Sequence, residues 1–229
     1  MYATLSFQPY FCLMNQIIVL IKKDLLVDFR QKYVVAGIAL YIFTLTYTAY
    51  LAFNNVITPA IWNALFWLNL LFSSVTGLSN SFSQEAQRSY YYYYLAKPIH
   101  ILIAKLIYYG MYELILIGLL TCAFNLFLGF PIENLSLFLV NLFVGAIGIA
   151  ACFTLIASIV AKTDNGSHLM LILAFPVIIP VLLIAVTNSR KILFGASITD
   201  ISENLLILIC FNVIIIALSF LLFPYSWKN

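Results

Sequence analysis

The residue types that bind metals or attack substrates are few in this sequence and stand far apart. They are four cysteines and two histidines: Cys12, Cys122, Cys152, Cys210, His100 and His168. None forms a CxxC, a CxxCH or another metal-ligand spacing, so we interpret the cysteines as helix-packing residues and the histidines as loop or interface residues. The sequence also lacks a GxxxxGK[ST] phosphate-binding loop. We therefore expect a chain that is not an enzyme, that has no catalytic residue, metal ligand or cofactor of its own, and that relies on a separate ATPase for any ATP-driven role.

Glu113 is the one acid well inside a long apolar stretch of the chain. A carboxylate at the middle of a bilayer costs about 2.5–3.5 kcal/mol on insertion scales, so such a residue is informative. Two interpretations stay open. We favour a protonated or hydrogen-bonded structural acid, and a member of a proton relay is the alternative.

Polar and small residues recur at helical spacing in two further apolar stretches. One set shares a helix face that Trp62 and Phe66 continue, and it consists of Asn69, Ser73, Thr76 and Asn80. The other set repeats the spacing with small residues, which let helices approach closely, and it consists of Asn141, Gly145, Gly148 and Cys152. We favour bundle packing for both faces, and a polar translocation surface is the alternative.

The amino-acid composition indicates whether these residues lie in a water-soluble domain or in a membrane. Hydrophobic residues make up 64% of the 229 residues and charged residues 8%, against roughly 25% charged in an average soluble domain. The mean hydropathy is +1.06. Because so few charges cannot cover a soluble globule, the sequence predicts an integral membrane protein and excludes a disordered chain, a secreted disulfide scaffold and a soluble enzyme with a small anchor.

Six apolar stretches are long enough to cross a bilayer as helices, which takes about 20 residues each. They are Tyr33–Phe53, Ile61–Phe82, Leu106–Leu128, Leu135–Ala161, His168–Asn188 and Asn204–Phe223. Their nearly continuous apolarity argues against barrel strands, which would alternate apolar and polar residues. We predict an all-α fold with a six-helix transmembrane domain over 33–223, an N-terminal segment over 1–32, a tail over 224–229 and an external segment over 189–203.

The N-terminal segment predicts a helix that lies in the membrane interface rather than one that crosses it. Asn15–Lys32 contains six charged residues, and an apolar stripe follows helical spacing through Ile18, Ile21, Leu25 and Phe29. The apolar run before it, Tyr10–Ile21, is too short to span and lacks the features of a signal peptide.

The distribution of Lys and Arg predicts the orientation. With the N-terminus in the cytoplasm, the external segments hold only Arg190 and Lys191. The cytoplasmic segments then hold Lys22, Lys23, Arg30, Lys32, Arg88, Lys97, Lys105, Lys162 and Lys228. Positively charged residues favour the cytoplasmic side, so both termini are expected there.

The segment Ser83–Lys105 is the longest loop between predicted spans. Glu85 and Arg88 are three residues apart and would face one another on a helix, and five tyrosines (Tyr90–Tyr94) with Leu95 suit the membrane boundary. Pro98 is expected to end that helix. We predict a helix that couples the chain to a cytoplasmic ATPase through Glu85, Arg88, Tyr90, Leu95 and Pro98, with a solvated connector as the alternative.

Two prolines, Pro176 and Pro180, lie four residues apart inside the fifth predicted span. A proline inside a helix removes a backbone hydrogen bond, so we predict a kink there.

These features together resemble the CcmB family, the ABC-2-type permease-like subunit of the cytochrome c maturation (haem exporter) system. The resemblance covers about Ile17 to Phe194. It rests on Lys23-Asp24-Leu25, on the stretch Pro176–Leu183, and on the order of Glu85, Leu95, Pro98 and Lys105. The chain departs from the family at Ser89-Tyr90 and the tyrosine run, where the family usually has Gly-Leu and more leucines.

The resemblance implies a multi-subunit complex in a bacterial inner membrane. Its expected partners are a CcmA-type ATPase, CcmC-type and CcmD-type membrane subunits, a CcmE-type haem chaperone and membrane lipid, with a second copy of this chain as a further candidate and no nucleic acid. Haem would be a cargo of the complex, and ATP would act through the partner. Two alternatives stay open: an ABC-2 permease for a lipid, drug or polysaccharide and, from a different class, a membrane-embedded enzyme.

Overall fold

The computed structural model describes residues 8–30, 32–53, 57–86, 98–129, 131–132, 134–160 and 166–228. Within these ranges the chain forms α-helices and no strand, which confirms the all-α prediction. The helices are α1 (Gln8–Arg30), α2 (Lys32–Ala52), α3 (Pro59–Ala86), α5 (Pro98–Leu128), α6 (Leu135–Val160), α7 (Gly166–Leu193) and α8 (Ile198–Lys228).

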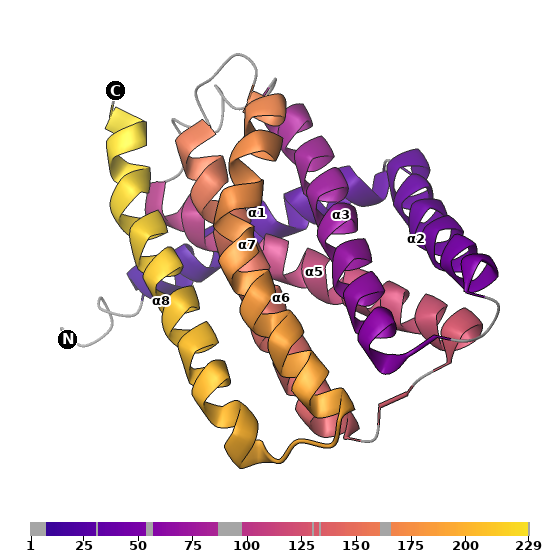
Figure 1. Cartoon of the computed structure of the whole chain (residues 1–229). Coiled ribbons are helices and arrows are strands. Elements are labelled where there is room, and N and C mark those ends of the chain that lie inside the picture. Colours follow the sequence, from indigo (N-terminus) through magenta and orange to yellow (C-terminus); the bar gives the residue numbers. More distant parts are fainter. Residues whose placement is uncertain are drawn as a thin grey trace.

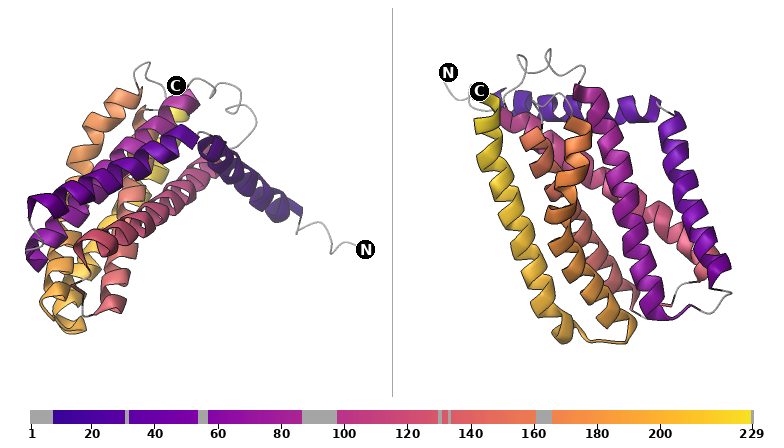
Figure 2. Two further views of the ribbon diagram at one scale, coloured as in Figure 1. Left: turned by 90° about the vertical axis from the view of Figure 1, so that its right-hand side faces the viewer. Right: turned by 45° about the horizontal axis from the view of Figure 1, so that its top comes forward.

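Six helices are long and apolar enough to cross a membrane, as predicted, and their apolar cores are Val35–Ala52, Pro59–Leu78, Ile99–Leu128, Leu135–Ala157, Ile172–Leu193 and Ile198–Phe223. Successive spans run in opposite directions (Figure 1). The helix α1 lies across one end of the bundle, where α2 begins and α8 ends (Figure 2, right). We call this the α1 end, and the opposite end, where α7 ends and α8 begins, the far end.

Several helices are longer than the apolar runs that predict them. The helix α5 begins at Pro98 rather than at residue 106, α7 continues to Leu193 and α8 begins at Ile198, so most of the predicted external segment 189–203 is helical. The predicted tail after residue 223 continues α8 to Lys228, and α1 begins at Gln8 rather than at Asn15. Hydropathy follows the lipid-facing length of a helix, whereas its hydrogen bonds continue into the polar interface.

The turn between α7 and α8 shows why these two helices end where they do. Gly195 adopts a positive φ of 77°, and the N–H of Ala196 donates to the carbonyl of Lys191 at 3.0 Å, which closes α7. The helix α8 then starts with a cap in which the backbone N–H of Ser197 donates to Asp200 Oδ2 at 3.0 Å.

The hydrophobic core of the bundle surrounds α6. The candidate membrane span of α6 is 72% buried, whereas the spans of α2 and α8 are each 22% buried. Aromatic rings fill the region where α3, α5 and α6 meet, with Trp62 stacked on Phe66 at a centroid distance of 5.3 Å and Phe124 in edge contact with both rings. The outer helices expose mostly apolar side chains, as lipid-facing helices do.

Candidate functional site

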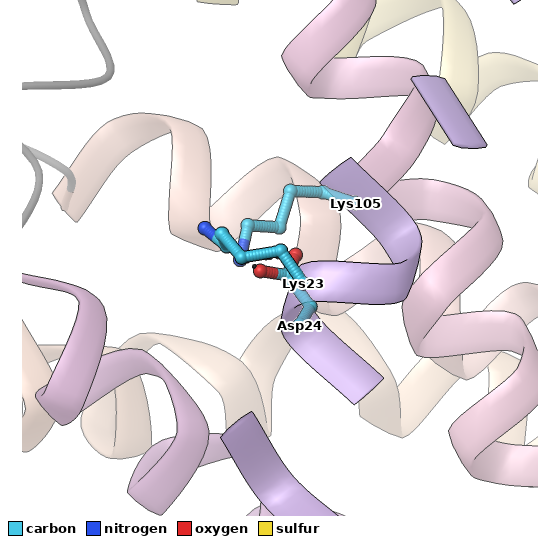
Figure 3. A network of polar contacts seen from close by, with 3 residues as sticks. All are labelled: Lys23, Asp24 and Lys105. Atoms are coloured by element: carbon cyan, nitrogen blue, oxygen red, sulfur yellow. Dashed lines mark ion pairs between the residues drawn. The ribbon is translucent and has the colours of Figure 1, made fainter. Parts of the chain in front are cut away.

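At the α1 end, an ion-pair cluster fastens α1 to the bundle. The carboxylate of Asp24 on α1 is only 5% exposed and lies 2.9 Å from Lys23 Nζ and 3.2 Å from Lys105 Nζ on α5 (Figure 3). Lys105 Nζ also lies 5.5 Å from the centroid of the Tyr108 ring. Since the cluster joins two helices that are far apart in sequence, it fixes the position of α1 on α5.

A second polar contact joins the same two helices. His100 is buried, and its Nδ1 lies 3.0 Å from Oε1 of Gln16 on α1. His100 thus acts in helix packing within α5, whereas the sequence predicts a loop or interface residue. The side chain of His168 lies outside the described residues.

The predicted apolar stripe of α1 is partly buried and partly exposed. Ile21 and Leu25 are half-buried, and Leu25 packs against the core, but Ile18 is 53% exposed. Val19 and Leu26, which lie off the predicted stripe, are also exposed, and the side chain of Phe29 lies outside the described residues. The place of α1 in the membrane interface stays a prediction, because periodicity alone does not tell which side of a helix faces the bundle.

Glu113 lies at the contact of α5 with α3 and is fully buried. Its Oε2 lies 2.8 Å from the hydroxyl of Ser74, which lies the same distance from the backbone carbonyl of Leu70. Close by, Tyr112 reaches so near to Gly77 that a Cβ there would overlap the Tyr112 hydroxyl. The acid is therefore hydrogen-bonded between two tightly packed helices, as the structural interpretation expects.

The predicted polar face of α3 is partly buried and partly exposed. Asn69 and Ser73 are buried, and Asn69 Nδ2 donates to the hydroxyl of Thr46 on α2 at 3.3 Å. Thr76 is exposed, with its hydroxyl donating to the carbonyl of Phe72 at 2.7 Å, and the side chain of Asn80 lies outside the described residues. Asn69 thus joins α3 to α2, and the Ser73 hydroxyl donates to Asn69 Oδ1 at 3.3 Å.

The small face of α6 lets three helices approach it closely. A Cβ on Gly145 would lie 2.8 Å from the Trp67 ring on α3, and one on Gly148 would lie 2.5 Å from Asn212 Oδ1 on α8 and 2.7 Å from Val181 on α7. The buried thiol of Cys152 points at the carbonyl of Val177, 3.6 Å away. The face therefore packs the bundle, in line with the favoured interpretation.

Sequence reasoning missed a buried polar cluster toward the far end. The Ser189 hydroxyl on α7 accepts hydrogen bonds from Trp67 Nε1 on α3 at 2.9 Å and from Asn141 Nδ2 on α6 at 2.8 Å. Asn63 on α3 donates to the carbonyl of Val186 at 2.9 Å, and the neighbouring Asn188 is fully buried. The signal was the pair of Asn63 and Trp67, four residues apart inside an apolar run.

The residues predicted to contact an ATPase lie mostly outside the described part of the chain. Arg88, Tyr90 and Leu95 fall in 87–97, and of Glu85 only its place near the end of α3 is described. Pro98 is the first residue of α5, and the helix that it was expected to end falls outside the described residues. Proline is well tolerated in the first turn of a helix, because its missing N–H would have no partner there.

Pro176 and Pro180 both lie inside α7, which is one continuous helix from Gly166 to Leu193. The structure thus places the two prolines within a single span, and the kink itself stays a prediction.

The polar groups brought together inside the bundle are suited to joining helices rather than to bond-making chemistry. Hydroxyls, amides and one carboxyl each bind a neighbouring helix, and no group of three or more His, Cys, Asp or Glu in the described ranges is arranged as a metal site.

Comparison with known proteins agrees with this architecture. No curated protein and no solved structure matches the chain. The family model described as "CcmB protein" matches residues 15–228. This range includes all six spans and all of α1 except its first two turns. The chain therefore belongs to the CcmB family and is a membrane component of the cytochrome c maturation haem exporter.

Proposed function

We propose that this chain is the permease subunit that transmits ATP-driven motion from a CcmA-type ATPase into the membrane. The motion drives haem delivery, or release of the haem-loaded CcmE-type chaperone, for cytochrome c assembly, together with CcmC-type and CcmD-type subunits. The observation that carries the proposal is the family match over residues 15–228 in a chain without a phosphate-binding loop. Such a chain needs a partner that binds ATP.

Charge supports the α1 end as the cytoplasmic end. Among the basic residues that the structure describes, Arg190 and Lys191 lie at the far end, whereas Lys22, Lys23 and Arg30 lie on α1 itself. Positive charge favours the cytoplasmic side of a membrane. This charge distribution supports the proposal that the ATPase and both termini lie at the α1 end.

The described contacts supply a route from the coupling segment into the bundle. The proposed coupling segment, residues 83–98, starts in the last turn of α3 and ends at the first residue of α5. Lys105 lies two turns after Pro98 and pairs with Asp24 on α1. A push on this segment therefore acts on α3 and α5 directly and on α1 through the ion pair. Buried contacts such as Ser74–Glu113 join α3 and α5, so the two helices would move together.

The double substitution Glu85→Ala with Arg88→Ala tests this route. We expect the membranes to retain less ATPase and to mature cytochrome c more slowly, because paired charges fix the register of an interface. The matched control is Arg190→Ala with Glu203→Ala, which removes one charge of each sign from exposed positions at the far end. Normal ATPase retention and normal maturation in the first variant would show that Glu85 and Arg88 form only a solvated face.

A further inference from the structure

The outer side of α1 carries a stripe of alternating apolar and basic residues. Ile18 is 53% exposed and Leu26 58% exposed, and Lys22 and Arg30 are exposed as well. These four residues are spaced four apart, so they form one row along the helix, with Val19 beside them at 64% exposed. We call these five residues the outer stripe of α1.

Contacts beside the outer stripe fix how α1 is rotated on the bundle. Asp24 is buried against Lys105 of α5, and Leu25 packs against the hydrophobic core. Because both residues contact the bundle, α1 cannot rotate without breaking an ion pair and exposing apolar surface.

The charges of α1 are separated around the helix. Asp24 lies on a side that contacts the bundle, whereas the outer stripe has two cations and no acid. A surface of apolar side chains between cations suits the boundary of an anionic membrane, where apolar groups insert and long basic chains reach phosphates. Exposure of this surface to water would be unfavourable, because three large apolar side chains would be hydrated.

The position of α1 agrees with such a boundary. The helix lies across the end of the bundle, and its first part extends sideways beyond the other helices (Figure 2, left). Tyr33, at the start of α2, is 93% exposed, and tyrosine is enriched at membrane–water interfaces. The outer stripe therefore lies near the level at which lipid headgroups surround the bundle.

We propose that the outer stripe is a binding surface for anionic phospholipid, in which Lys22 and Arg30 bind headgroup phosphates and Ile18, Val19 and Leu26 insert between the acyl chains. The surface serves to hold α1 flat at the membrane. It does not depend on which ATPase or cargo the complex uses.

The test measures lipid retained by the full-length protein. The protein is extracted from vesicles of equal parts phosphatidylglycerol and phosphatidylcholine, and native mass spectrometry then counts each lipid on the chain. We expect the wild type to be enriched in phosphatidylglycerol. The double substitution Lys22→Ala with Arg30→Ala should weaken that preference by about fivefold for each basic residue removed. This factor corresponds to about 1 kcal/mol for each basic side chain near an anionic surface.

Two controls keep the result specific. Arg190→Ala with Lys191→Ala removes the same charge from the far end and should keep the preference, and so should Lys22→Arg with Arg30→Lys, which also guards against misfolding. An unchanged preference in the Lys22→Ala, Arg30→Ala protein, or an equal loss in the far-end control, would overturn the proposal. It would also be overturned if that protein kept its phosphatidylglycerol but lost a co-purifying subunit, since the stripe would then bind protein.

Discussion

At the scale of single residues, the contacts of Ser74 with Leu70 and Glu113 indicate which group donates each hydrogen bond. The Ser74 hydroxyl has one hydrogen, yet its oxygen lies 2.8 Å from both the Leu70 carbonyl and Glu113 Oε2. Both contacts are full hydrogen bonds only if the carboxyl supplies the second hydrogen. A neutral carboxylic acid also avoids the cost of a buried charge, and no basic side chain is paired with Glu113 in the described ranges. We therefore interpret Glu113 as a hydrogen-bond donor that joins α5 to α3.

This interpretation predicts that an amide can replace the acid. Glu113→Gln should change the free energy of unfolding by less than about 1 kcal/mol, because the amide N–H₂ also donates to Ser74. Glu113→Ala should cost about 2–4 kcal/mol, since it leaves a cavity between packed helices. Thermal unfolding of the purified protein in detergent measures both changes.

Leu114→Ala is the control for Glu113, because Leu114 is the next residue on α5 and is 44% exposed. Its substitution should have a small effect. If Glu113→Gln destabilised the protein as much as Glu113→Ala, the negative charge itself would be required, and the interpretation as a neutral donor would be wrong.

At the scale of helices, the sequence predicts which segments cross the membrane but not how each is rotated. Long apolar runs identify all six spans, because hydropathy is a property of each segment alone. The side that each helix buries depends on its neighbours. Asn141 therefore appeared as one residue of a small face, and its hydrogen bond to Ser189 on α7 could not be foreseen.

The ends of the helices are less predictable for a related reason. The helix α5 begins eight residues before the predicted span. Its first turns contain His100 and Lys105, whose polarity suggests a loop, but Gln16 and Asp24 on α1 bind these side chains. Contacts with α1 thus stabilise the helical conformation of a segment that contains polar residues.

The close approach of α6 to α7 and α8 predicts opposite outcomes for two glycine substitutions. Gly148→Ala should destabilise the protein by about 1–3 kcal/mol, because its Cβ would lie 2.7 Å from Val181 on α7. Gly118→Ala should be neutral or stabilise by up to about 1 kcal/mol, since nothing lies within 4 Å of its Cβ and alanine favours a helix.

Thermal unfolding of the two glycine variants under identical conditions compares them directly. Equal effects at the two positions would contradict the packing of α6 described above, because only one of them is in close contact with neighbouring helices.

At the scale of the whole molecule, the basic residues divide the bundle into two unlike ends. The α1 end has α1 with Lys22, Lys23 and Arg30, and the far end has Arg190 and Lys191. This asymmetry predicts that both termini lie in the cytoplasm.

Thiol labelling in intact cells tests the orientation. In a chain whose own cysteines are replaced, Arg190→Cys should react with a membrane-impermeant reagent added outside, and Tyr94→Cys should react only after the membrane is opened. The reverse pattern would place the α1 end outside the cytoplasm and would remove the ATPase from the coupling segment.

The central claim is that this chain works as the membrane subunit of a haem exporter whose ATPase is a separate protein. Purification of the tagged full-length chain in mild detergent, followed by identification of bound proteins and an ATPase assay, tests it most directly. We expect an ABC ATPase with a phosphate-binding loop to co-purify with CcmC-type and CcmE-type proteins, and ATP hydrolysis to disappear when that ATPase is removed. The claim would be contradicted if the chain hydrolysed ATP alone, or if it purified only with the subunits of a different export system.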